Sequence, residues 1–250
     1  MTERDTAPET PFAPAPRIAA VGEAALLVTF GDRWDPRVNR AALAFDAALA
    51  RRNLAGVTET VPTIASVLVR FDPLVRAPHV LRQDLAEMLA ARDWYDAPPP
   101  PGRRRLTLPA VYGGDAGPDL AEVADLLGLR EDQVGDAHAE RALTVAMLGF
   151  APGCAYLAGL GATWDLPRRK TLRPSVPAGA ILVAVRQTVL PANPMPTGWR
   201  WIGRTPARTF SPEASEPFLL RPGDEVSFAP VTEAEAARLG PGPLATEVLA

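Results

Sequence analysis

The chain has 250 residues, a formal net charge of −3 and a hydrophobic fraction of 47%. This length allows one large domain or two small ones with a self-sufficient core, and the slight acidity without any strongly basic segment excludes the electrostatic footprint of a nucleic-acid-binding protein. A single cysteine excludes an internal disulfide and is compatible with a reducing compartment.

The N-terminal segment and the hydropathy pattern bear on location. Residues 1–16 combine acidic residues with several prolines and contain no apolar run, which predicts a disordered leader and not a signal peptide. No stretch approaches the roughly 18 consecutive apolar residues that a membrane-spanning helix needs. We therefore expect a cytoplasmic protein without a membrane partner.

Residues 17–96 alternate between strand and helix patterns. Asp35-Pro36 opens a helix whose apolar residues recur at helical spacing, and Asn53 and Gly56 end it. The other elements expected here are one or two strands in 17–30, strands at 57–61 and 64–71, and a helix at 78–92. This order predicts an α+β fold with a ferredoxin-like N-terminal domain.

A proline-rich linker follows at residues 97–102, where four consecutive prolines interrupt every regular element. Residues 103–231 then carry many short strands with early helices, which predicts a closed β-barrel-like domain. The expected strands are 105–112, 143–148, 180–185, 199–202, 219–220 and 225–228, and the expected helices are 118–127 and 131–141. Residues 232–250 are predicted to form a short helical or disordered tail.

An ordered set of motifs rich in glycine and proline lies in the second half of the chain. It comprises Gly149-Phe150-Ala151-Pro152-Gly153, Pro167-Arg168-Arg169, Val176-Pro177-Ala178-Gly179, Gln187-Thr188, Gly198-Trp199 and Ile202-Gly203-Arg204-Thr205, with Leu220-Arg221-Pro222-Gly223-Asp224 after them. Over residues 17–230 the sequence resembles the subunit-1 family of allophanate hydrolase-like proteins, which includes the B-type component of 5-oxoprolinase (PxpB) and the sporulation kinase inhibitor KipI.

The resemblance implies a cyclophilin-like β-barrel for the second domain and a subunit-2 partner of the PxpC/KipA type. It also implies ATP-dependent opening of 5-oxoproline to glutamate by the assembled complex, with a third subunit of the LamB/YcsF (PxpA) type. The chain departs from the family at residues 184–192, where three glycines and a tyrosine of the usual pattern are replaced. Val at such a position supplies neither positive φ nor space for a ligand.

Polar side chains within these motifs are the candidate substrate contacts. Arg168 and Arg169 could hold a carboxylate through bidentate hydrogen bonds, although adjacent side chains diverge and at most one should face the site. Gln187 and Thr188 offer amide and hydroxyl partners for an anionic or amide substrate, or else cap a strand. Arg204 could face the same pocket, and Gly153 would shape its wall.

His138 matches a histidine position of the family and is the candidate general acid or base, against the alternative of a structural histidine. Cys154 follows a glycine turn, but the family carries Phe there, which favours a packed residue over a nucleophile. The sequence contains no phosphate-binding loop with Gly-Lys-Ser/Thr, no nucleophile elbow and no metal-ligand cluster.

Two functions remain open from the sequence. The first is a subunit of an ATP-dependent 5-oxoprolinase-like complex that contributes half of a shared site with its subunit-2 partner. The second is a KipI-like regulatory protein that inhibits a sensor histidine kinase, for which a binding surface suffices and a competent pocket is not needed.

Overall fold

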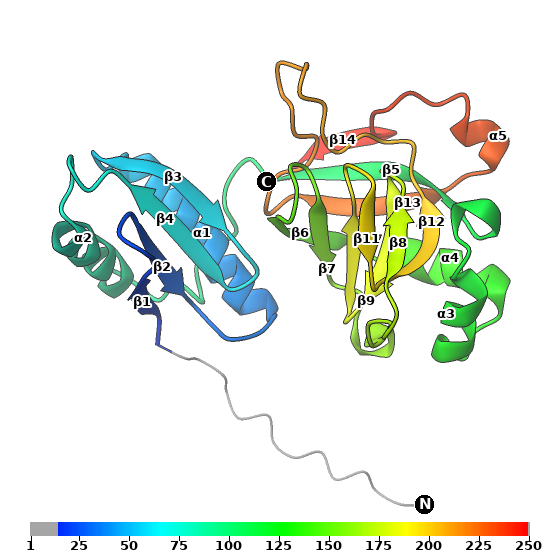
Figure 1. Ribbon diagram of the computed structural model, residues 1–250, viewed down its shortest axis with the longest axis horizontal. Helices are drawn as coiled ribbons and strands as arrows, with labels where there is room; N and C mark the ends of the chain where they lie inside the picture. Colours follow the sequence, from blue (N-terminus) through cyan, green and yellow to red (C-terminus); the bar gives the residue numbers. More distant parts are fainter. Residues whose placement is uncertain (1–14, 250) are drawn as a thin grey trace, which may run out of the picture. The chain divides into compact units, whose positions relative to one another are not determined.

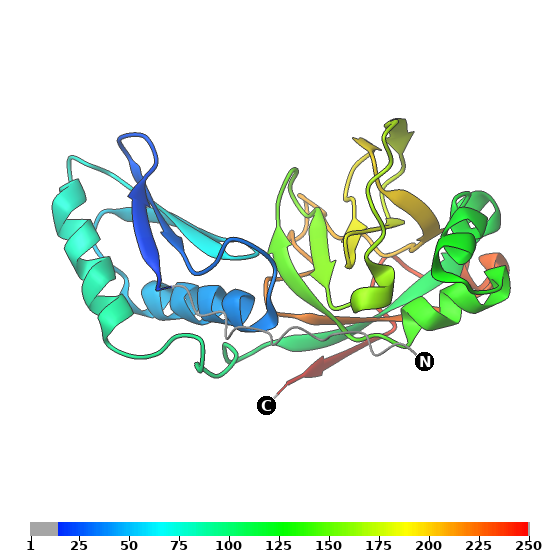
Figure 2. The ribbon, with the colours of Figure 1, turned by 90° about the horizontal axis from the view of Figure 1, so that it is seen from below.

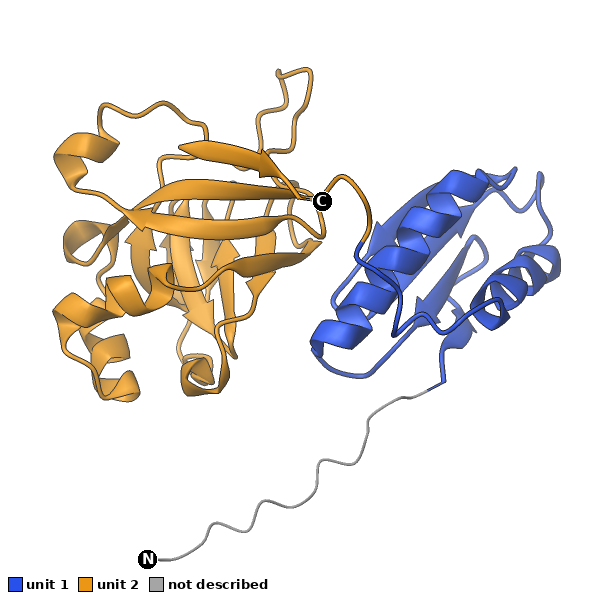
Figure 3. Cartoon of the chain, turned by 180° about the vertical axis from the view of Figure 1, so that it is seen from behind, with its two compact units in different colours: residues 1–99 blue, residues 100–250 orange. Residues whose placement is uncertain are grey.

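The computed structural model describes residues 15–249, so the predicted leader lies outside the described residues except for its last two positions. The chain forms two compact units, and the boundary between them falls between Pro99 and Pro100, inside the proline run (Figure 3). Within residues 15–249, none of the helices combines the length and the apolar character that crossing a bilayer requires.

The first unit is a four-stranded antiparallel sheet in the order β1-β2-β4-β3 (Figure 1). Helices α1 and α2 lie on one face of this sheet (Figure 2), and their apolar residues share one core with its strands. The element bounds are β1 Arg17–Ala20, β2 Ala25–Thr29, α1 Pro36–Arg52, β3 Val57–Pro62, β4 Ser66–Phe71 and α2 Pro78–Ala90. This arrangement confirms the predicted ferredoxin-like α+β fold.

Helix α1 forms where the sequence signals it. Asp35 is the N-cap and accepts hydrogen bonds from the backbone N–H groups of Arg37 and Val38, and Pro36 occupies the first turn. Asn53 ends the helix in the left-handed conformation, with φ 46°. Because the capping residues and the apolar stripe lie within one segment, local sequence is enough to place this helix.

The second unit is a closed barrel of seven strands in the order β12-β9-β10-β7-β6-β13-β5, with β12 pairing back onto β5. The β13–β5 pair is parallel, and the other pairs of the ring are antiparallel. Its strands are β5 Arg104–Tyr112, β6 Leu143–Leu148, β7 Ala155–Ala158, β9 Ala180–Ala184, β10 Gln187–Leu190, β12 Arg200–Arg204 and β13 Glu225–Pro230. This confirms the predicted barrel.

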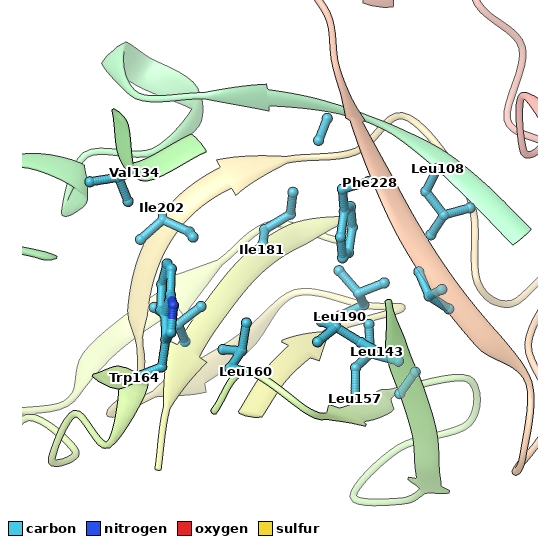
Figure 4. Packing of buried hydrophobic residues seen from close by; sticks show 14 of the residues in the cluster. Leu108, Val134, Leu143, Leu157, Leu160, Trp164, Ile181, Leu190, Ile202 and Phe228 are labelled. Carbon is cyan, nitrogen blue, oxygen red and sulfur yellow. The ribbon is translucent and has the colours of Figure 1, made fainter. Parts of the chain in front are cut away.

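Alternation along the strands divides the apolar residues of the barrel between two cores. One set fills the interior, where Leu143, Leu157 and Ile181 pack with Phe228 (Figure 4). The other set lies on the outer face of β7, β9 and β10, together with residues of a ribbon formed by β8 (Arg173–Val176) and β11 (Met195–Thr197). Helices α3 (Leu120–Leu127) and α4 (Glu131–Ala139) pack against the interior set.

Several elements differ from the expectations. Residues 219–220 form no named strand, and an isolated bridge joins Phe210 to Phe218 instead. The C-terminal tail contains the expected short helix, α5 (Glu233–Ala236), and also an unexpected strand, β14 (Ala245–Val248), which pairs with β5. The ribbon strands and β14 depend on partners distant in the chain, so no local pattern announces them. Short 3₁₀ turns occur at Gly114–Ala116 and Ala162–Trp164.

Candidate functional site

The residues predicted to bind substrate lie in separate environments of the second unit. Arg168 belongs to what we call the outer-face cluster, together with Tyr156 and Trp199. The Tyr156 and Trp199 rings meet edge to face with centroids 6.2 Å apart, and the guanidinium carbon of Arg168 lies 5.4 Å from the centroid of the Trp199 ring. The cluster therefore presents a cation on an aromatic base.

Arg168 is exposed, and among the described residues it forms no ion pair. Burial raises the pKa of the Tyr156 hydroxyl, and the nearby Arg168 charge offsets part of that rise. Gln187 pairs with Ala184, which belongs to the apolar core on this same outer face, so its side chain lies on that face too. Arg168 is thus a cation available to an incoming anion, and the buried Gln187 borders its cluster.

Arg169, by contrast, is engaged in a network around Asp119. The Asp119 Oδ1 atom accepts from Arg169 Nη1 at 2.8 Å and from Arg173 Nη2 at 2.6 Å, and its Oδ2 atom accepts from the backbone N–H of Trp201 at 2.9 Å. The Asp119 side chain is 7% exposed. As expected for adjacent arginines, Arg168 and Arg169 diverge, and Arg169 serves the network.

Glu122 extends this network by one helical turn. Its carboxylate lies 3.4 Å from Arg169 Nη1 and accepts from Arg200 Nε at 3.0 Å. The network ties the start of α3 to β8 and β12. Sequence reasoning missed Asp119, Glu122, Arg173 and Arg200 as a group because the acidic and basic partners are at least 47 residues apart, as Arg169 and Glu122 show.

His138 and Thr188 lie inside the barrel. The His138 ring is fully buried; its Nδ1 atom is 2.8 Å from the Tyr112 hydroxyl, and its Nε2 atom is 2.8 Å from Thr188 Oγ1. The ring also contacts those of Trp164 and Phe228. Burial lowers the pKa of His138 to about 3 and raises the pKa of the Tyr112 hydroxyl. This geometry fits an uncharged imidazole that orients Thr188 better than a proton donor to a ligand.

Cys154 is fully buried in the outer-face core, and burial raises the pKa of its thiol to about 11. The thiol is therefore protonated at neutral pH, and a protonated thiol is a poor nucleophile. This agrees with the prediction of a packed residue. No group of three or more His, Cys, Asp or Glu side chains within residues 15–249 is arranged to hold a metal ion.

Arg204 and Gly153 lie near a separate pocket, where β9 begins and β12 ends. Arg204 lines this pocket of about 600 Å³. Gly153 lies behind its wall, since a Cβ atom there would come within 2.4 Å of the Phe210 Cβ. Five residue steps along the β12 segment separate Arg204 from Trp199, or about 16 Å of extended chain. The structure therefore divides the predicted site between two places.

The segment that departs from the family pattern forms the β9–β10 hairpin. Its two loop residues, Val185 and Arg186, both have positive φ, 42° and 64°. Such loops favour Asn and Gly, and a β-branched residue with positive φ is strained. Val189, by contrast, is buried in the outer-face core. The lost glycines thus have different consequences at different positions.

We expect Val185→Gly to raise the free energy of unfolding of the second unit by up to about 1 kcal/mol, because relief of left-handed strain exceeds the added chain entropy. Val189→Gly, which restores another family glycine, should instead lower it by about 2–3 kcal/mol by leaving a cavity. Urea unfolding of the two variants measures both changes. A loss of stability in Val185→Gly would contradict the assignment of strain.

Comparisons with known proteins place the chain. Residues 16–220 match the model of the carboxyltransferase domain, subdomain C and D. The chain is 34% identical over 229 residues to the B-type component of the 5-oxoprolinase of Bacillus subtilis, covering 87% of this chain and 93% of that protein. It is 37% identical over 220 residues to the protein of the same name from Escherichia coli O157:H7, covering 87% and 97%.

Solved structures agree with these sequence matches. The structure named TTHA0988 superposes with a TM-score of 0.72 at 33% identity over 83% of this chain, and the chain spans only 40% of that protein's length. The urea amidolyase of K. lactis shares the fold alone, with a TM-score of 0.71 at 18% identity over 93% of this chain and 16% of its own. The chain belongs to the family of carboxyltransferase domains, subdomains C and D.

Proposed function

We propose that this chain is the B-type component of an ATP-dependent 5-oxoprolinase and contributes half of a site that it shares with a subunit-2 partner. The observation that carries the proposal is the match of 87% of the chain to two proteins that bear the name of this 5-oxoprolinase component. In the reaction, water adds across the lactam C–N bond of 5-oxoproline to give glutamate, and hydrolysis of ATP by the assembled complex drives the opening.

The partner supplies what this chain lacks. The family match covers subdomains C and D only, and the chain spans 40% of TTHA0988. A subunit-2 protein of the PxpC/KipA type would complete the carboxyltransferase-like architecture, and a LamB/YcsF-type subunit would join it. ATP is then handled by the complex, in keeping with the absence of a Gly-Lys-Ser/Thr phosphate loop from this sequence.

Within the proposed shared site, Arg168 binds the substrate carboxylate. Its guanidinium lies over Trp199 and is exposed, so an anion can approach it from the open side. Gln187 borders the same face, whereas Arg169 is held by Asp119 and Thr188 by His138. We therefore assign carboxylate binding to Arg168, with Arg169 and Thr188 in supporting positions.

The test is co-expression of the chain with its subunit-2 and LamB/YcsF-type neighbours, followed by an assay of ATP-dependent conversion of 5-oxoproline to glutamate. Arg168→Gln should lower kcat/KM by about 10- to 100-fold, the value of one charged hydrogen-bonded contact. Arg130→Gln removes an equally exposed type of charge, whose ion pair with Asp132 lies at the start of α4, and it should leave turnover unchanged.

Turnover that survives Arg168→Gln at full rate would remove Arg168 from the site. A stable complex without ATP-dependent ring opening would refute the substrate assignment. Capture of a sensor histidine kinase by such an inactive complex would then favour the inhibitor function.

A further inference from the structure

The pocket at the other end of β12 is a second place where the chain can bind a ligand. Its volume of about 600 Å³ suits a small organic molecule. The walls are largely proline and alanine, with Phe210 among them, and the charged side chains that line it are Arg204, Arg208 and Glu233. Two positive charges against one negative charge leave a single positive charge in excess.

Two glycines allow the walls of this pocket to meet. Gly179 has φ 77°, and a Cβ atom there would lie 2.4 Å from the carbonyl oxygen of Thr205. Gly153 has φ 73°, and a Cβ atom there would come within 3.1 Å of the Thr209 carbonyl oxygen and closer still to Phe210. A side chain at either glycine would force these walls apart. The pocket is therefore built by the same motif glycines that identify the family.

Polar groups of the pocket are left with bonding capacity. Thr209 is 2% exposed, and its hydroxyl has no hydrogen-bond partner among the described residues. Burying a hydroxyl without a partner is costly, and a rotation about the first side-chain torsion could turn it to a bound molecule. Arg208 is exposed, and within residues 15–249 its guanidinium takes part in no ion pair.

Arg204 already holds a carboxylate. Its Nη2 atom lies 3.1 Å from Glu233 Oε2 and 3.3 Å from Glu233 Oε1. Both side chains are about half exposed, at 46% and 58%, so the pair is weak and its carboxylate can be exchanged. Glu233 lies on α5, beyond residue 220, where the family match ends.

We propose that this pocket binds a small organic monocarboxylate, which Arg208 and Arg204 hold while Thr209 donates a hydrogen bond, and that Glu233 occupies Arg204 until the ligand displaces it. The excess of one positive charge matches one carboxylate, and planar guanidinium groups match its geometry. The rigid apolar walls favour a compact ring beside the carboxylate. The site is separate from the outer-face cluster and does not depend on the proposed 5-oxoprolinase activity.

Isothermal titration of the full chain with cyclopentanecarboxylate, and with cyclopentanecarboxamide as its neutral match, tests the proposal. The carboxylate should bind with a Kd of about 1 mM or tighter, and the amide should bind at least about tenfold more weakly. Arg208→Gln should weaken carboxylate binding about tenfold. Inorganic phosphate as a competing probe distinguishes the two anion classes, and phosphate that binds more tightly than the carboxylate would overturn the assignment.

Two further variants separate binding from folding. Thr209→Val should weaken binding about fivefold while leaving the thermal midpoint equal or higher, since the buried hydroxyl has no partner to lose. Glu233→Gln should tighten binding about three- to tenfold, because its carboxylate no longer competes for Arg204. Glu216→Gln, which affects a similarly exposed pair with Arg221, should change neither quantity.

Arg168→Gln should leave this binding unchanged, which keeps the result independent of the shared site. Absence of carboxylate binding, or affinity that none of Arg208→Gln, Thr209→Val and Glu233→Gln alters, would overturn the proposal.

Discussion

Asp119→Ala is expected to lower the free energy of unfolding of the second unit by about 3 kcal/mol, because removing one partner leaves a partly buried charge network uncompensated. The change deprives Arg169 and Arg173 of their shared carboxylate oxygen and leaves the backbone N–H of Trp201 without its side-chain acceptor. The carboxylate is 7% exposed and its two arginines are about one-third exposed, so water replaces the lost bonds only in part.

Urea unfolding followed by circular dichroism measures this loss. Asp119→Asn keeps an oxygen that can accept from Trp201 but removes the charge, and we expect it to fall between the wild type and Asp119→Ala. Glu216→Ala is the control, since its pair with Arg221 is exposed and should contribute nothing measurable. Equal stability of Asp119→Ala and Glu216→Ala would show that the network carries no stabilisation.

Acidification should unfold the second unit through His138. Its pKa is lowered to about 3 in the folded chain, whereas an exposed imidazole has a pKa of about 6.5, so the unfolded state binds the proton first. The stabilising effect of the neutral ring is complete above about pH 6.5. It is lost as pH falls towards 3, at up to roughly 1 kcal/mol per pH unit.

The measurement is the free energy of unfolding in urea at several pH values between about 5 and 7, for the wild type and for His138→Gln. The variant lacks the titrating ring, so its stability should vary less with pH, and the difference between the two curves isolates His138. His79 is exposed in the first unit and is present in both proteins, so its contribution cancels. Parallel curves would mean that His138 titrates in the folded protein as it does in the unfolded one.

Patterns confined to one segment of the sequence predicted much of the architecture. The helix that begins after Asp35 and the run of prolines before residue 102 are local signals, because caps and ring constraints act within a few residues. The barrel strands were predicted in number only approximately. Strand β14 could not be predicted, since its pairing with Arg104–Tyr112 joins segments more than 130 residues apart, as Ala245 and Thr107 show.

The candidate site was predicted less completely than the fold. Arg168 and Arg169 are adjacent and chemically identical, and nothing in their sequence says which one Asp119 will hold. Likewise His138 could have faced a ligand or the interior, and only its contacts with Tyr112 and Thr188 show that it is an interior group. A residue's type states which bonds it can form, whereas its neighbours decide which bonds it does form.

By itself, the sequence determined the family, the two kinds of fold and the motif glycines, because spacing, capping and turn chemistry act locally along the chain. Only the tertiary structure decided that these motifs serve two places, an exposed arginine over Trp199 and a separate pocket that Arg204 and Arg208 line. The reason is geometric, since the two ends of one extended strand are neighbours in sequence but lie too far apart to contact the same small molecule.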